Sequence, residues 1–132
     1  MDDPWARWNE IALLDPSEVS SADRPLYAIG WLRTEINSDG FDGLFFNLAG
    51  NVVPHATEAA RSAGAADLAD LVERAMSVLG DDYPLDVDQR QGLMTALSEA
   101  DRGRLDALDR EYYELEASTD LDELMRSLAA RS

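Results

Sequence analysis

Hydrophobic residues recur along most of this chain at the three-to-four-residue spacing of amphipathic helices. The clearest stripe comprises Leu68, Leu71, Val72, Ala75, Met76 and Leu79. Residues 25–37 carry apolar side chains on several sides, which predicts a buried helix near the middle of the fold. Strand-like alternation is confined to four residues around Val52 and Val53. The pattern predicts an all-α fold, with residues 1–132 forming a single compact domain of about seven helices.

Pro, Gly and short polar residues mark where these helices begin and end. Pro25 suits the first turn of the central helix. The helix is expected to end at residues 37–40, Asn-Ser-Asp-Gly, because Asn and Gly accept the left-handed conformation that stops a helix. The other expected helices span residues 5–14, 54–64, 67–80, a segment capped by Asp86 or Asp88, 101–118, and a last helix after the capping sequence of residues 119–122.

All three phenylalanines follow the central helix within GFDGLFFN, residues 40–47. Phe41 and Phe45 lie one helical turn apart. We expect Phe41, Phe45 and Phe46 in the core, because Phe at helical spacing is usually buried. Asn47 is expected to bind backbone groups where this segment meets the next turn.

This segment resembles the signature of the DMP19-like family of bacterial proteins, which is named for a DNA mimic. The usual family motif is close to NGGFxQFFFN. The matching residues are Gly40, Phe41, Phe45, Phe46 and Asn47. Ser38-Asp39 replaces the Asn-Gly of the motif and Gly43 replaces its Gln. The resemblance extends over roughly residues 26–79, with weaker similarity near Tyr112-Tyr113. It implies the family fold and, more loosely, an acidic partner-binding function.

The net charge is the unusual property of the composition. The chain has 27 acidic residues and 11 basic ones, all of them arginine, which gives −16 at pH 7. Ordinary small domains lie within about 2 to 8 charges of neutrality. Such a charge disfavours direct binding to nucleic acid or to a membrane surface and favours a basic protein partner. The plainer interpretation is that the charge serves solubility or reflects a salt-adapted or GC-rich genome.

Targeting signals are not expected. No apolar run approaches the roughly 20 residues of a membrane span, and the acidic start Met1-Asp2-Asp3 is unlike that of a signal peptide. The chain has no cysteine, so disulfides and thiolate metal sites are excluded. These features predict a cytoplasmic protein.

Residues for catalysis or metal binding are few. His55 is the only histidine, and no activated nucleophile accompanies it. The loop at residues 37–43 superficially resembles a calcium loop, but Phe41 and Leu48 occupy positions that should supply oxygen ligands. We therefore expect no enzyme activity, no cofactor and no specific metal site.

The acids are concentrated towards the two ends of the chain. Net charges are −6 for residues 1–43, −2 for 44–80 and −8 for 81–132, so the middle segment is interpreted as core. The helix of residues 101–118 has six acids and three arginines over about 27 Å, where duplex DNA carries roughly sixteen phosphates. A DNA mimic would have to pool acids from several elements. The predicted contact residues are Asp81, Asp82, Asp86, Asp88, Asp106, Asp109, Glu111 and Glu114.

Three functions remain open. The resemblance implies a DNA mimic, acting as a dimer, that occupies a basic DNA-binding regulator. A second hypothesis is an immunity-type inhibitor of a toxin enzyme, which would depend on aromatic anchors more than on salt. A third is an acidic helical domain that binds an unrelated ligand near the phenylalanines.

Overall fold

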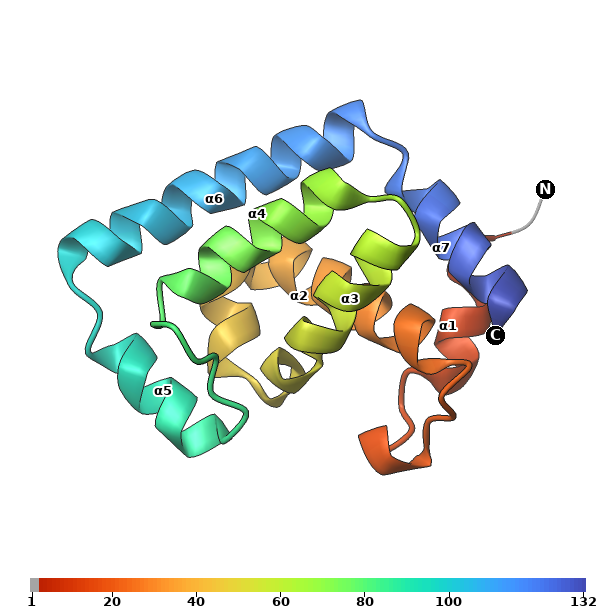
Figure 1. The fold of residues 1–132 in the computed structure, drawn as a ribbon, viewed down its shortest axis with the longest axis horizontal. Coiled ribbons are helices and arrows are strands. Elements are labelled where there is room, and N and C mark those ends of the chain that lie inside the picture. Colours follow the sequence, from red (N-terminus) through yellow and green to blue (C-terminus); the bar gives the residue numbers. More distant parts are fainter. Residues whose placement is uncertain (1–2) are drawn as a thin grey trace.

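The computed structural model describes residues 3–132, so Met1 and Asp2 of the acidic start lie outside the described residues. This part of the chain contains helices and no strand (Figure 1). The helices are α1 (Ala6–Ile11), α2 (Arg24–Phe46), α3 (Val53–Ser62), α4 (Ala66–Ser77), α5 (Val87–Thr95), α6 (Glu99–Ser118) and α7 (Leu121–Arg131), with two 3₁₀ helices, η1 (Pro16–Glu18) and η2 (Leu48–Val52). The predicted compact all-α fold of seven helices is confirmed.

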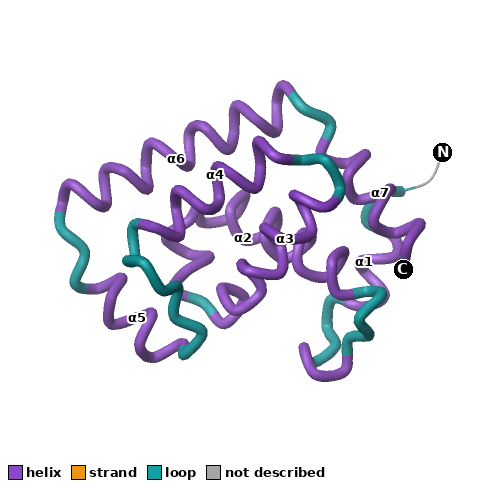
Figure 2. The backbone as a smooth tube through the Cα atoms, viewed as in Figure 1, coloured by secondary structure: helices purple, strands orange, loops and turns teal. Residues whose placement is uncertain are grey.

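Helix α2 is the element around which the others pack. It contacts α1, α3, α5, α6 and α7, and it lies behind α3 and α4 in Figure 1. Leu26, Ile29, Leu32 and Ile36 have no exposed surface, which confirms the predicted central helix. In Figure 2 the segment that joins α1 to α2, with η1 at its tip, projects from the body of the helices.

The regular helix of residues 24–39 is interrupted at Gly40, where α2 bends. Gly40 has φ 71° and ψ −171°, and two helical segments meet at it before the helix ends at Phe46. The positive φ at Gly40 and the end of the first helical run there are as predicted, whereas the immediate start of a second helical segment was not predicted. The second segment can begin at once because the Asp109 carboxylate of α6 accepts a hydrogen bond from the Phe41 backbone N–H at 2.8 Å, satisfying a donor freed by the bend.

The phenylalanine motif divides between core and surface. Phe41 and Phe45 have no exposed surface, as predicted, whereas Phe46 is 45% exposed, so its prediction as a core residue was wrong. One residue is about 100° of helix rotation, so Phe46 turns away from the core that holds Phe45. The role predicted for Asn47 was also wrong, because its side chain donates to Glu35 Oε2 at 3.2 Å and not to the backbone.

The helix caps largely follow the local sequence. Asp86 caps α5 by accepting from Gln89 N at 3.1 Å, as predicted. Helix α6 begins at Glu99, two residues earlier than expected, because Ser98 is its N-cap. The last helix is capped by Asp120 and not by Thr119, since the Asp120 side chain accepts from the Glu123 N–H.

A candidate acidic surface on α4 and α6

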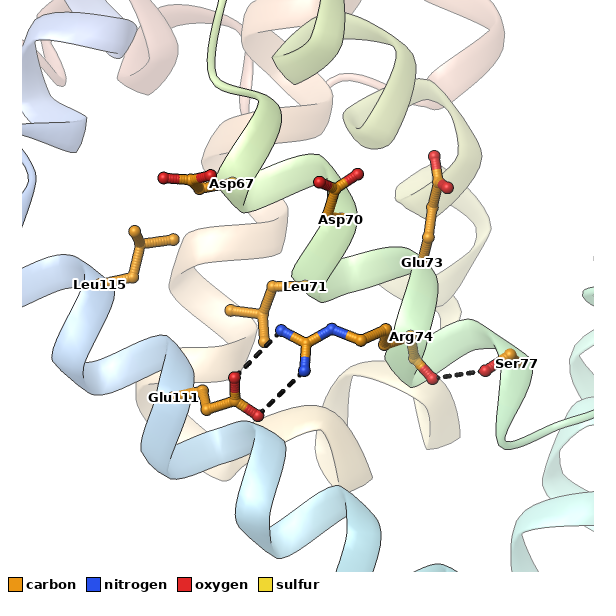
Figure 3. A pocket seen from close by; sticks show the side chains of 8 residues that line it. All are labelled: Asp67, Asp70, Leu71, Glu73, Arg74, Ser77, Glu111 and Leu115. Atoms are coloured by element: carbon orange, nitrogen blue, oxygen red, sulfur yellow. Dashed lines mark hydrogen bonds and ion pairs between the residues drawn. The ribbon is translucent and has the colours of Figure 1, made fainter.

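Helices α4 and α6 lie side by side and run antiparallel (Figure 1). A cleft of about 720 Å³ lies between them. Its lining residues, drawn in Figure 3, are Asp67, Asp70, Leu71, Glu73, Arg74, Ser77, Glu111 and Leu115. Four of these eight are acids and one is an arginine, so the cleft is predominantly negative.

Two arginines partly neutralise the cleft. Arg74 donates two hydrogen bonds to Glu111, at 3.2 and 3.0 Å. Arg61 of α3 reaches both Asp70, at 3.0 Å, and Glu73, at 2.8 Å. Exposed pairs of this kind add little stability. The cleft has four acids, Asp67, Asp70, Glu73 and Glu111, against these two arginines. The cleft therefore keeps a net negative charge.

The predicted contact acids do not all meet in this cleft. Glu111 lines it, while Asp106 and Glu114 are exposed elsewhere on α6. Asp81 and Asp82 are exposed in the loop after α4, and the other two predicted acids are exposed at the start of α5, where one of them serves as the N-cap. Of the predicted contact acids, the structure therefore brings only Glu111 next to the acids of α4. The others lie outside this cleft.

The α4 acids were missed because residues 44–80 were interpreted as core. Asp67, Asp70 and Glu73 are three residues apart and exposed, opposite the buried stripe that begins at Leu68. The apolar stripe predicted which face of α4 packs inward. The three acids on the opposite face could therefore have been predicted to be exposed. The small net charge of the whole segment concealed it.

Asp109 does not project freely into solvent as expected. It is half-buried, and its carboxylate holds the Phe41 N–H. Burial raises the pKa of Asp109, Asp106 and Asp42 add to the effect by repulsion, and the Phe41 hydrogen bond opposes it. The side chain therefore has a structural role at the bend of α2, whatever else it contacts.

Substitution of Asp109 should separate its charge from its hydrogen bond. Asp109→Ala is expected to lower the free energy of unfolding by about 1–2 kcal/mol, because it leaves the Phe41 N–H without an acceptor. Asp109→Asn keeps an acceptor oxygen and should leave stability at pH 7 unchanged or raised. A carboxyl group with a raised folded-state pKa favours folding at low pH and loses that contribution as pH rises. Any gain in the free energy of unfolding of Asp109→Asn over the unmodified protein should therefore shrink as pH falls.

Urea unfolding of both Asp109 variants at pH 7 and pH 4.5 measures these differences. If Asp109→Asn is as unstable as Asp109→Ala at both pH values, the carboxylate acts through its charge and the proposed role of the hydrogen bond is wrong.

A second acidic residue, Glu116, is half-buried and bonded to the neighbouring helix α2. Its carboxylate accepts from Arg33 at 3.0 and 2.8 Å, from Asn37 at 3.2 Å, and from the Tyr112 hydroxyl. Burial alone would raise the pKa of Glu116, but the hydrogen bonds and the Arg33 charge outweigh it, so the pKa is lowered. Arg33 also pairs with Asp122 at 3.1 Å. This network joins α2, α6 and α7 and contributes no free carboxylate to the surface.

The acidic side chains that the structure describes do not gather into a metal site. Within residues 3–132, no group of three or more His, Asp or Glu side chains is arranged to hold a metal ion. No helix in that range is long and apolar enough to cross a membrane. The single histidine, His55, is exposed near the start of α3.

These features define a small, strongly acidic, all-α domain built around one bent helix. The model of the DMP19-like protein family matches residues 17–131, which include α2 to α7. The chain therefore belongs to the DMP19-like protein family. The match extends well beyond the residues 26–79 over which the motif suggested a resemblance. No curated protein and no solved structure matches the chain significantly.

Proposed function

We propose that this chain is a non-enzymatic interaction protein that binds a basic protein by presenting carboxylates where DNA presents phosphates. The observation that carries the proposal is the pairing of α4 and α6. It places Asp67, Asp70 and Glu73 of one helix across a cleft from Glu111 of the other. A cleft with acids on both walls is a closer imitation of a duplex, which has two charged strands, than one acidic helix. The proposed partner is a DNA-binding regulator.

The charge density limits how the imitation works. Helix α6 has 20 residues, or about 30 Å, over which duplex DNA carries roughly 18 phosphates. Asp109 and Glu116 are committed to internal hydrogen bonds. The α4 acids and the loop acids Asp81, Asp82 and Asp88 would extend the row. A second copy of the chain would double it, so the proposal includes a homodimer.

Neutralising acids without internal partners tests the proposal. The variant Asp82→Asn/Asp106→Asn/Glu114→Gln alters three exposed side chains that form no hydrogen bond or ion pair of their side chains within residues 3–132. The control Glu10→Gln/Glu58→Gln/Glu123→Gln alters exposed acids on α1, α3 and α7, of which Glu10 pairs with Arg7 and Glu123 with Arg126. Each variant changes the net charge by three, from −16 to −13, so a difference between them reports position and not total charge.

The partner is first captured from the native cell lysate at low salt, eluted with a salt gradient and identified by mass spectrometry. Its affinity for each variant is then measured by calorimetry at two salt concentrations. The α6 and loop variant should bind about tenfold or more weakly, with a flatter salt dependence, because close charges at an interface govern both. The control should bind like the unmodified protein, and duplex DNA should compete.

Equal weakening by the two variants would show that only total charge matters. A captured enzyme that survives high salt and ignores DNA would contradict mimicry and favour the immunity hypothesis.

A further inference from the structure

A second depression in the surface lies away from the acidic cleft. It encloses about 1070 Å³ between the α1–α2 connection on one side and η2 with the start of α3 on the other. Leu13 and Leu14 line the first side, Leu48 and Val52 line the second, and Trp31 of α2 also lines the depression. It shares no lining residue with the cleft between α4 and α6. We call it the leucine groove.

The apolar side chains of the leucine groove are unusually exposed. Leu13 is 94% exposed and Leu48 is 67% exposed. Single exposed leucines are ordinary on protein surfaces. Several that line one groove form an apolar patch of the kind that marks an interaction site.

Hydrogen bonds hold the groove in shape. The Trp31 indole N–H donates to Ala12 O at 3.1 Å, and the Tyr27 hydroxyl donates to Leu14 O at 3.1 Å. The Trp31 ring also packs edge-on against Trp8, with centroids 5.3 Å apart. These contacts tie the α1–α2 connection to the central helix. A preformed groove loses little conformational entropy when a partner binds.

Three carboxylates stand among the lining residues, and each is oriented by an uncharged donor. Asp15 accepts from the Ser17 N–H and hydroxyl at 2.9 and 2.8 Å, which lowers its pKa. Glu18 accepts from Asp15 N at 3.0 Å. Glu35 accepts from the Asn47 amide at 3.2 Å.

None of these three carboxylates forms an ion pair with a residue in 3–132. Arg24 is the single arginine among the lining residues. The leucine groove therefore combines apolar walls with an excess of negative charge, three carboxylates against one arginine.

We propose that the leucine groove binds a basic amphipathic helix of another protein. Apolar side chains spaced by three and four residues would enter between Leu13 and Leu48, which is the usual helix-in-groove mode. Lysines or arginines on the flanks of that helix would meet the three carboxylates. This proposal concerns a different face from the acidic surface of α4 and α6 and goes beyond DNA mimicry.

The shape and charge of the groove favour a helix over a small molecule. Small-ligand sites bury most of the ligand surface, whereas this groove is open and its leucines extend into solvent. A helix about 10–12 Å across, side chains included, covers such a surface with one face and leaves the other in water. The carboxylates oppose an anionic amphiphile such as a fatty acid.

A synthetic helix provides the probe. An 18-residue peptide of leucine and lysine, with leucine repeating at i, i+3, i+4 and i+7, is compared with two others. One has the same composition in scrambled order, and the other has glutamate in place of lysine. Affinity is measured by fluorescence anisotropy, and the binding site by the NMR signal of the Trp31 indole N–H, which is assigned from Trp31→Phe. The basic amphipathic peptide should bind about tenfold or more tightly than either and shift the Trp31 signal.

Matched variants locate the binding. Leu13→Ser/Leu48→Ser should weaken the basic peptide about tenfold or more, because both removed side chains contact it. Leu85→Ser alters a leucine that is 57% exposed outside the groove and should leave binding unchanged. Glu35→Gln should weaken binding a few-fold and flatten its salt dependence.

Several results would overturn the proposal. One is binding that leaves the Trp31 signal unmoved, which would place the peptide on the general acidic surface. Others are equal affinity for the glutamate peptide, or no effect of the double leucine change. A change in the sedimentation of the protein alone caused by Leu13→Ser/Leu48→Ser would show that a second copy covers the groove. The α6 and loop triple variant leaves the groove intact, so failure here is distinguishable from failure of the mimicry proposal.

Discussion

Arg90→Leu is expected to lower the free energy of unfolding by about 4 kcal/mol, because it removes a fully buried charge that holds several backbone groups. Arg90 has no exposed surface. Its Nε donates to Phe45 O at 2.6 Å and its Nη2 donates to Asn47 O at 2.8 Å. Its Nη1 donates to Pro84 O at 2.9 Å and to Asn51 Oδ1 at 2.7 Å. One guanidinium thus joins the end of α2, η2 and the loop before α5.

The cost is large because the partners of Arg90 are mainly backbone carbonyls. An apolar residue sometimes replaces a buried ion pair without loss, since both charges can be removed together. Here the carbonyls of Phe45 and Pro84 remain when the arginine is gone, and each loses this donor, whereas Asn47 O keeps the Gly50 N–H. The positive charge also lies at the C-terminal end of α2, where the helix dipole favours a cation.

Urea unfolding followed by circular dichroism measures the change. Arg104→Leu is the control, because Arg104 is 69% exposed and should alter stability by less than about 0.5 kcal/mol. Arg90→Lys keeps the charge but not the planar arrangement of donors, so an intermediate loss is expected. Equal midpoints for Arg90→Leu and Arg104→Leu would show that the end of α2 does not depend on this side chain.

Gly40→Ala is expected to cost about 3 kcal/mol of stability, because two effects add. At φ 71° and ψ −171° the backbone of Gly40 occupies a region that side chains strongly disfavour. A Cβ at this position would also lie 2.5 Å from Asp109 Oδ2, so the carboxylate would have to move and weaken its bond to the Phe41 N–H.

Gly103→Ala is the matched control for Gly40. Gly103 lies inside α6, and a Cβ added to it would meet no neighbouring atom within 4 Å, so alanine there should add up to about 1 kcal/mol of stability. The variants should therefore change the thermal midpoint in opposite directions. Adding Asp109→Ala to Gly40→Ala removes the crowding but not the backbone strain, so it should not restore stability. Full recovery in that double variant would assign the whole cost to crowding.

Asp109 also shows why the predicted interaction site needed correction. Spacing along α6 placed Asp109 away from the leucine stripe. That spacing does not reveal that the bend of α2 packs against the face of α6 on which Asp109 lies. Glu111 illustrates the opposite case, since it was predicted as a contact acid and lies in the cleft with Asp67 and Asp70. The pairing of α4 with α6 brings these acids together, and no local pattern specifies that pairing.

The sequence alone determined the local features of this protein. Helical spacing of apolar residues located the seven helices, and glycine chemistry predicted the left-handed conformation at Gly40. The motif around Phe41 and Phe45 indicated the family, because those residues pack in the core and constrain the fold. Each of these features depends on neighbours within about one helical turn, so the local sequence carries the information.

The tertiary structure decided what depends on long-range contacts. Arg90 looks like any surface arginine in the sequence, yet its acceptors lie 6 to 45 residues away in the chain. The continuation of α2 past Gly40 depends on Asp109, 68 residues from its partner Phe41. The acidic cleft and the leucine groove likewise form between separate elements. The physical reason is that burial and charge at these positions are set by packing between helices, which helical periodicity leaves undetermined.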